Sequence, residues 1–179
     1  MNQIDASDKV WFALRVTYNR ELKVKADLDV RGVESFIPMC YKDFVKNGKK
    51  SRKLVPSVHN LIFIRMSPDE MKDYKATTVL PIRYMMDKEK HAPIIVPDCQ
   101  MSNFMNVAGT NDEGLVYIDP MELNIKKGDR VRVTGGIFRG SEGVLMRVKG
   151  DRRVVVSIPG VVAVATAFIH PSLIEKINS

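Results

Sequence analysis

Cysteine is scarce in this chain of 179 residues, which has only Cys40 and Cys99. The two cysteines stand far apart, and neither belongs to a Cys-x-x-Cys pair. A structural zinc site normally needs four ligands at short spacings. The sequence therefore predicts free thiols, and we expect no metal ion and no cofactor.

The sequence also lacks a hydrophobic run of the roughly 18 residues that a membrane-spanning helix needs. Its N-terminal segment, MNQIDASDKVW, has no basic-then-apolar signal and carries two aspartates. We therefore expect a cytoplasmic protein without a membrane partner.

Residues grouped for catalysis are missing as well. The three histidines, His59, His91 and His170, lie far apart in the sequence, without an acidic residue at metal-ligand or triad spacing. The glycines of TGGIFRGSEG suggest a phosphate loop, but no Gly-Lys-Ser or Gly-Lys-Thr follows them. The sequence predicts that the protein is not an enzyme.

Basic residues are in excess, with 28 Lys and Arg against 21 Asp and Glu and a net charge of +7. This excess suits contact with nucleic acid or with an acidic nucleoprotein assembly. Many small soluble proteins are equally basic and bind nothing anionic, so the positions of the charges matter more than their sum. Hydrophobic residues make up 45% of the chain, which is enough to build at least one core.

The first strand and the first helix are predicted near the N-terminus. Residues 10–17 are apolar and β-branched and predict a strand. Residues 20–31 are ambiguous, because their apolar positions alternate as in a strand while their composition favours a helix. We predict a helix with Asn19 as its N-cap and Gly32 as its stop. The alternating positions are Leu22, Val24, Ala26, Leu28 and Val30.

The elements that follow complete an α+β unit. Two β-rich stretches, 33–45 and 54–66, flank an Asn47-Gly48 dipeptide that predicts a hairpin turn. A Ser-Pro pair and two early acids begin a predicted helix over 67–75. Short strands are expected at 82–86 and 93–96, with a third helix after Pro97. The order β-α-β-β-α-β-β-α predicts a mainly antiparallel sheet with flanking helices.

A second domain is predicted beyond a linker. Residues 108–121 mix Gly, Asn, acids and Pro without a sustained period, so we assign them as a linker that holds one short strand at 115–118. The linker would join a domain at 9–107 to a domain at 122–179. In the latter, β-branched residues dominate and turn signals recur, which predicts a small all-β barrel of the SH3-like kind.

The strongest local pattern opens this second domain, where Lys-Gly-Asp-Arg-Val-Arg-Val is followed by Gly-Gly-Ile-Phe-Arg-Gly and Gly-Val. Alternation would place the valines on one face of a strand and the arginines on the other. The glycines permit turns with positive φ, and the phenylalanine could close the end of a barrel. The pattern resembles the KOW motif of NusG-type factors and several ribosomal proteins. The matching residues are Gly128, Asp129, Val131, Val133, Gly136, Phe138, Gly140 and Gly143.

The N-terminal part resembles the NusG N-terminal (NGN) domain. It has an aromatic strand near the start, a helix that carries Glu21, the segment GVESFIPM, a basic hairpin tip, a strand ending in IFIRM and a later API-I-VP element. With the KOW motif, the resemblance covers residues 10–177 in the right order. API-I-VP and the absence of a large insertion look most like the operon-specific antiterminators typified by RfaH and UpxY.

The resemblance implies a bacterial transcription elongation and antitermination factor that is a monomer and suppresses pausing or termination. Such proteins use an apolar concave face of the NGN sheet to bind the clamp helices of the largest RNA polymerase subunit. Strand parity supports two pairs within the matching set. The alternative is that these side chains fill the core beneath a helix. The set is Arg15, Leu61, Phe63, Tyr84 and Met86.

The resemblance also implies contacts with DNA. The hairpin tip holds five cations that could bind phosphates near the transcription bubble, although a solvated loop is the alternative. Arg20 and Lys23 could contact the non-template strand, although Asp27 and Asp29 lie among the nearby basic residues. The hairpin cations are Lys46, Lys49, Lys50, Arg52 and Lys53.

The chain departs from the family pattern at two turns. His59-Asn60-Leu61 stands where Pro-Gly-Tyr is usual, and Ile158-Pro159-Gly160 stands where Phe-Gly-Arg is usual. The second departure puts in question the binding of the termination helicase or of a ribosomal protein.

The main alternative function is a ribosome- or RNA-binding KOW protein. From Glu122 onwards the chain has ten Lys and Arg against five acids, so the KOW domain could contact RNA or a ribosomal protein. The N-terminal domain favours the polymerase factor, because a ribosomal protein has no need of an apolar groove.

Overall fold

The computed structural model describes residues 8–119 and 128–177. The chain divides into two compact units: an N-terminal unit of residues 1–37 and 58–98, and a C-terminal unit of residues 38–57 and 99–179. This division groups the basic hairpin and most of the third helix with the C-terminal strands. It therefore differs from the boundaries expected from composition.

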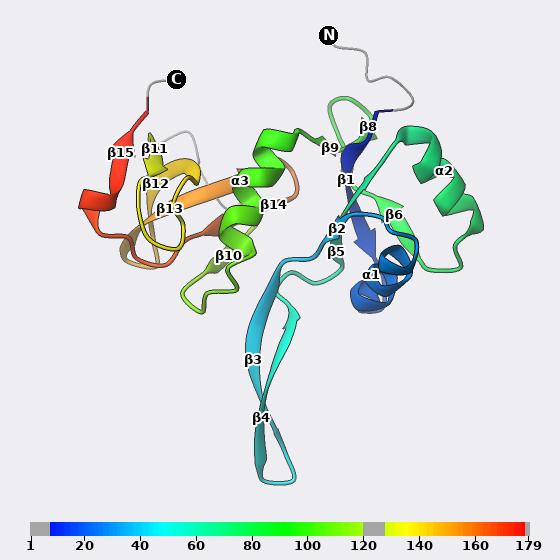
Figure 1. The fold of residues 1–179 in the computed structure, drawn as a ribbon, viewed down its shortest axis with the longest axis horizontal. Coiled ribbons are helices and arrows are strands. Elements are labelled where there is room, and N and C mark those ends of the chain that lie inside the picture. Colours follow the sequence, from blue (N-terminus) through cyan, green and yellow to red (C-terminus); the bar gives the residue numbers. More distant parts are fainter. Residues whose placement is uncertain (1–7, 120–127, 178–179) are drawn as a thin grey trace. The chain divides into compact units, whose positions relative to one another are not determined.

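The N-terminal unit is built on an antiparallel sheet in the order β2-β5-β1-β6, with β9 also paired to β1 (Figure 1). The central strands are β1 (Val10–Val16) and β5 (Leu61–Met66). The outer ones are β2 (Ser35–Phe36), β6 (Ile82–Tyr84) and β9 (Ile95–Val96). A separate pair joins β7 (Met86–Asp87) to β8 (Ala92–Pro93). The predicted antiparallel sheet is confirmed, but the strands expected at 82–86 and 93–96 are each split in two.

The first helix, α1, runs from Glu21 to Val30, and its burial resolves the ambiguity of the sequence. Val24 and Leu28 are fully buried, whereas Leu22 is 49% and Val30 is 90% exposed. The buried positions therefore repeat with the helical period and not with the alternation of a strand. The prediction of a helix is confirmed.

The predicted start of α1 is wrong, and its predicted stop is confirmed. The N-cap is Arg20, which makes no side-chain cap bond. Asn19 has a φ of 51° instead of the extended conformation of an N-cap residue. At the other end, the N–H groups of Gly32 and Val33 donate to the carbonyls of Asp29 and Leu28, as in a Schellman motif.

The second helix, α2, runs from Pro68 to Thr77. The Ser67 hydroxyl accepts a hydrogen bond from the Glu70 N–H, and the Glu70 carboxylate accepts one from the Ser67 N–H, which forms a capping box. Met71 and Tyr74 are buried. The Arg31 guanidinium lies 5.3 Å from the centre of the Tyr74 ring, and its hydrogen bond to Asp27 lowers the pKa of that carboxyl. Arg31 therefore links the end of α1 to Tyr74 of α2.

The C-terminal unit contains a hairpin of β3 (Met39–Lys46) and β4 (Lys49–Pro56). Asn47 and Gly48, with φ of 52° and 73°, form its turn, as predicted. The third helix, α3 (Asp98–Ala108), follows Pro97 as expected. Within this unit the side-chain oxygen Oδ1 of Asn103 in α3 accepts a hydrogen bond from the backbone N–H of Glu142 at 3.1 Å.

The remaining strands form a six-stranded sheet in the order β10-β14-β13-β12-β11-β15, in which each neighbouring pair is antiparallel. This arrangement confirms the all-β region predicted after the linker. The short strand expected at 115–118 is β10, which pairs with β14, so this part of the predicted linker belongs to the sheet. The bounds are β10 Val116–Ile118, β11 Asp129–Val133, β12 Glu142–Val148, β13 Asp151–Ile158, β14 Val162–Ala165 and β15 Ile174–Lys176. A 3-10 helix, Pro171–Leu173, precedes β15.

Both faces of this sheet carry buried aliphatic side chains. One face carries Val155, Ala163 and Ala165, against which Val116 and Ile118 of β10 pack. The other face carries Val154 and Val164, which are fully buried.

Among the helices of the described residues, none has the length and the apolar composition of a membrane span.

Candidate functional site

The sheet register places three of the five expected polymerase-binding residues on one face of the N-terminal unit. Arg15 lies opposite Leu61, and Ala13 lies opposite Phe63, so Arg15, Leu61 and Phe63 share a face. Arg83 joins them, because it lies opposite Arg15 on β6. Both arginines are exposed, whereas Leu61 and Phe63 are 3% and 0% exposed. The exposed side chains of Arg15 and Arg83 are therefore cationic, whereas Leu61 and Phe63 are buried and Phe36, which lies opposite Phe63, is half-buried.

Tyr84 lies on the opposite face of the same sheet. Its partner on β1 is Leu14, and its ring lies 5.8 Å from that of Phe12. The Lys75 ammonium of α2 lies 3.7 Å from the ring centre, and burial raises the pKa of the Tyr84 hydroxyl. The expectation that all five residues line one face is therefore wrong. The residues that share a face within one strand can be identified from the sequence. Which residues of two different strands share a face depends on the pairing register, which was not predictable.

Met86 lies outside the five-stranded sheet. It belongs to β7, where it pairs with Pro93 of β8, and its side chain is 50% exposed. It is therefore accessible to a partner, but it belongs neither to β6 nor to the face that carries Arg15.

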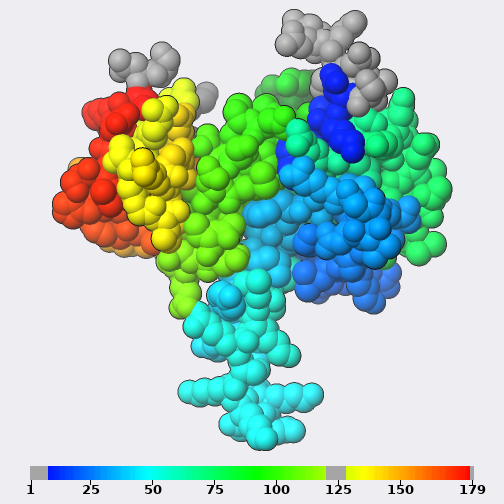
Figure 2. Space-filling view, viewed as in Figure 1, coloured from blue at the N-terminus to red at the C-terminus, as the bar shows by residue number. Residues whose placement is uncertain are grey.

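Residues 41–54 of the basic hairpin are all exposed, which leaves both of its faces open to solvent. One side of the hairpin is visible in Figure 2. The register pairs Lys46 with Lys49 and Lys42 with Lys53. These four residues lie on one face, which we call the lysine face. Lys50 and Arg52 lie on the other face, where Arg52 pairs with Asp43. The five cations predicted as one cluster are therefore divided between two faces.

Two aromatic residues accompany these cations. The Lys53 ammonium lies 5.9 Å from the centre of the Phe44 ring, and the Arg52 guanidinium lies 4.9 Å from that of Tyr41. Arg52 also forms an ion pair with Glu113. Sequence reasoning missed Lys42 and Phe44, although Lys42, Phe44 and Lys46 alternate along β3 and would share a face of any strand.

The cations of α1 are distributed along an exposed surface. Lys23 is exposed, and the Arg20 guanidinium lies 5.8 Å from the ring of Tyr18. Lys25 pairs with Asp29 at 2.9 Å and Arg31 pairs with Asp27 at 3.0 Å. These pairs neutralise part of the positive surface next to Arg20 and Lys23.

The valines and the phenylalanine of the KOW motif are buried, as the pattern predicts. Val131 and Val133 are buried in β11, and Phe138 is 5% exposed. Asp129 forms an ion pair with Lys176 of β15 at 2.9 Å. The KOW motif therefore contributes a buried side chain from the loop after β11 and an ion pair between β11 and β15.

The glycines of the KOW motif serve two purposes. Gly136 and Gly140 have positive φ, of 76° and 85°, and form turns as predicted. Gly143 lies within β12, where a Cβ atom would stand 2.4 Å from the Val155 carbonyl oxygen. A Cβ at Gly128 would likewise stand 2.4 Å from the Val144 side chain. The prediction of a positive-φ turn at Gly143 is therefore wrong, and close packing requires the absence of a side chain at both Gly128 and Gly143.

No group of three or more potential metal ligands occurs within residues 8–119 and 128–177. His59, His91 and His170 are exposed. The His170 ring nitrogen Nδ1 lies 2.8 Å from the Ser172 hydroxyl at the start of the 3-10 helix. The described surfaces carry exposed charged and apolar side chains that are suited to binding a partner.

Comparisons with known proteins agree with these features. The family described as transcription termination factor nusG matches residues 9–105, and the KOW motif matches residues 127–157. A solved structure titled "Domain interaction in Thermotoga maritima NusG" is 23% identical, with a TM-score of 0.48, and the match covers 97% of this chain and 100% of that chain. Comparison with curated proteins found no match. Because the first match spans more than half of the chain, the protein belongs to the NusG family of transcription factors.

Proposed function

We propose that this NusG-family protein is a bacterial transcription elongation and antitermination factor that binds RNA polymerase through residues 9–107. The observation that carries the proposal is the presence of a NusG domain and a KOW motif in one chain. The first would bind the clamp helices of the polymerase, and the second would contact another partner. Within the family, we place the protein among the specialised antiterminators of the RfaH and UpxY kind.

The polymerase-binding surface is proposed at the face that carries Arg15. Arg15 and Arg83 are exposed there and lie opposite each other, next to the buried Leu61. Guanidinium groups held on a rigid sheet suit recognition of carboxylates on a partner. Met86 is exposed and remains a candidate contact, whereas Tyr84 is half-buried on the opposite face.

The lysine face of the hairpin is proposed to bind the DNA backbone near the transcription bubble. Two pairs of lysines lie directly opposite each other on this face, and like charges in that position destabilise a strand pair. Phosphates would relieve this repulsion and would bind without sequence preference. Arg20 and Lys23 form a second candidate surface for the non-template strand.

The proposed mechanism depends on binding to RNA polymerase and involves no covalent step. Docking across the clamp would hold the polymerase closed and steady the upstream edge of the bubble, and this would suppress pausing and termination. The part of the chain that carries the KOW motif, residues 122–179, which we call the KOW unit, would raise the effective concentration of its own partner near the polymerase.

A second candidate function is that of a ribosome- or RNA-binding KOW protein. It is favoured by Arg147 and Arg152, which lie directly opposite each other on β12 and β13 and are both exposed. This function would place binding on the C-terminal strands, and the N-terminal unit would not engage polymerase.

Transcription in vitro tests the proposed function. The full chain is added to elongation complexes on a template with a pause site and an intrinsic terminator. We expect shorter pauses and more read-through, with a weaker effect for Arg15→Glu. Increased termination would contradict antitermination and would identify the protein as a termination factor. An unchanged transcript pattern would contradict any effect on elongation.

A further inference from the structure

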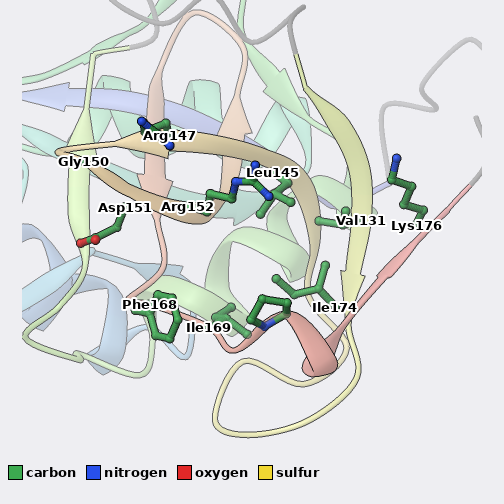
Figure 3. Close-up of a pocket in the computed structure, with 11 residues that line it drawn as sticks. Val131, Leu145, Arg147, Gly150, Asp151, Arg152, Phe168, Ile169, Ile174 and Lys176 are labelled. Carbon is green, nitrogen blue, oxygen red and sulfur yellow. The ribbon is translucent and has the colours of Figure 1, made fainter.

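We propose that the KOW unit has a binding pocket for an acidic peptide that carries apolar anchor residues. The proposal rests on the proposed role of this unit in holding a second partner, and it does not depend on polymerase binding. The pocket has a volume of about 460 Å³ and lies among β11, β12, β13, β15 and the segment that follows β14 (Figure 3).

The floor and one wall of the pocket are aliphatic. Leu145 and Val131 share a sheet face, because they lie opposite Asp129 and Gly143 in the pairing of β11 with β12. Ile169 and Ile174 line the pocket from the other side, where Phe168 is 62% exposed (Figure 3). A cavity of this size and lining can accept one or two apolar side chains.

The rim of the pocket is cationic. Arg147 and Arg152 flank the turn formed by Lys149 and Gly150, and the register places them directly opposite each other on the face of the pocket. Within the described residues, neither arginine forms an ion pair. Asp151, the one acid among the described residues that line the pocket, pairs with Arg153 at 3.3 Å.

This arrangement is unfavourable in the free protein and favourable with an anionic ligand. Like charges opposite each other destabilise a strand pair, while a carboxylate between two guanidinium groups accepts strong hydrogen bonds from both. Lys176 lines the same pocket, although it is partly neutralised by Asp129 at 2.9 Å. Charge therefore selects an acidic ligand, and the aliphatic lining selects one with apolar side chains.

A peptide fits the pocket better than RNA does. Proteins that bind single-stranded RNA usually stack its bases on aromatic side chains or guanidinium planes. The rim arginines offer guanidinium planes to a base, but the floor offers none, because it consists of aliphatic side chains and Pro171, and Phe168 is the only aromatic side chain among the described residues of the lining. Leucine or phenylalanine between acidic residues would use both the apolar floor and the cationic rim.

Nuclear magnetic resonance of the full chain tests the pocket with defined probes. The blocked peptide Glu-Asp-Leu-Phe-Asp-Glu is titrated and followed through the amide signals of Leu145, Phe168 and Ile174. We expect saturable shifts confined to the pocket. Binding should weaken at least tenfold with Glu-Asp-Ser-Ser-Asp-Glu, which lacks the anchors, and with Lys-Lys-Leu-Phe-Lys-Lys, which reverses the charge.

Variants of the protein separate the roles of charge and fold. Arg152→Glu should weaken binding of the acidic peptide at least tenfold, while Arg152→Lys keeps the charge and most of the affinity. Arg139→Glu makes the same charge change outside the pocket and should leave binding unchanged. Because Arg152→Glu also removes a like-charge pair, its thermal midpoint should be equal to or higher than that of the unchanged chain.

The proposal is overturned if the acidic peptide leaves the pocket signals unmoved at millimolar concentration, or if the peptide without anchors binds equally well. It is also overturned if short oligouridylate RNA shifts these signals and the peptide does not, which would assign the pocket to RNA. Polymerase binding of Arg152→Glu is measured in parallel and should be unchanged. A failure of polymerase binding by every form of the chain would contradict the proposed function and leave the peptide result standing.

Discussion

At the scale of single residues, the buried carboxylate of Glu21 is unusual for its position at the start of α1. Glu21 is 2% exposed, and its carboxylate accepts a hydrogen bond from the N–H of Asn60, which precedes β5. Asn60 has a φ of 63°. This bond therefore holds the turn before β5 against the first helix, and it fixes the end of the strand that carries Leu61.

Replacing Glu21 with alanine should destabilise the protein. The substitution leaves the Asn60 N–H without its acceptor, so we expect a loss of about 1–3 kcal/mol in the free energy of unfolding. Urea denaturation measures the change. Lys23→Ala on the exposed side of α1 is the matched control and should change stability by less than about 0.5 kcal/mol. Equal effects of the two substitutions would contradict the structural role of Glu21.

Tyr117 gives a prediction about alkaline pH. Burial raises the pKa of its hydroxyl from 10.0 to about 12. The neutral hydroxyl is therefore favoured in the folded chain, and this contribution to stability is complete below pH 10 and is lost as the pH rises toward 12. Tyr117→Phe should lose less stability than the unchanged chain between pH 10 and 12 in thermal melts. If the thermal midpoints of the two proteins fell equally over this pH range, the role assigned to the Tyr117 hydroxyl would be contradicted.

At the scale of elements, helix and turn signals were readable because they are local. The Ser67 cap, the Gly32 stop and the Asn47-Gly48 turn each depend on residues close together in the chain. The position of Tyr84 relative to Leu61 depends on the register of strands far apart in the sequence. For this reason the elements could be predicted, but the single five-residue surface could not.

The capping box of α2 can be tested by a pair of substitutions. Ser67→Ala removes the hydroxyl that accepts the Glu70 N–H, and we expect it to lower the free energy of unfolding by about 1 kcal/mol. Ser67→Asp keeps an acceptor and should retain most of the stability. Chemical denaturation of both variants provides the comparison, and equal losses would show that the cap bond is unimportant.

The hairpin offers two neighbouring lysines on opposite faces as a matched pair. If the lysine face binds phosphates, Lys49→Ala should weaken binding to duplex DNA and reduce the slope of log affinity against log salt by about 0.9. Lys50→Ala should have a smaller effect, because Lys50 lies on the face that also carries Asp43. Fluorescence anisotropy across a salt series measures both quantities. Equal effects of the two variants would contradict binding through one face.

At the scale of the whole molecule, family membership follows from the order of motifs along the chain. The KOW residues were predictable where they depend on local turns and on alternation within a strand, as Gly136 and Val131 illustrate. The close packing of Gly143 against Val155 of another strand was not predicted. The grouping of the hairpin with the C-terminal strands was not predictable. Arg52 of the hairpin and Glu113, which are far apart in the sequence, form an ion pair within this unit.

The most direct test of the central proposal is the affinity of the full chain for core RNA polymerase. We predict that the chain binds and that Arg15→Glu weakens binding at least tenfold without a change in circular dichroism. Val30→Ala, on the exposed side of α1, is the control and should bind as the unchanged chain does. Absence of polymerase binding, together with capture of RNA or ribosomes by the full chain, would contradict the proposal and favour the ribonucleoprotein function.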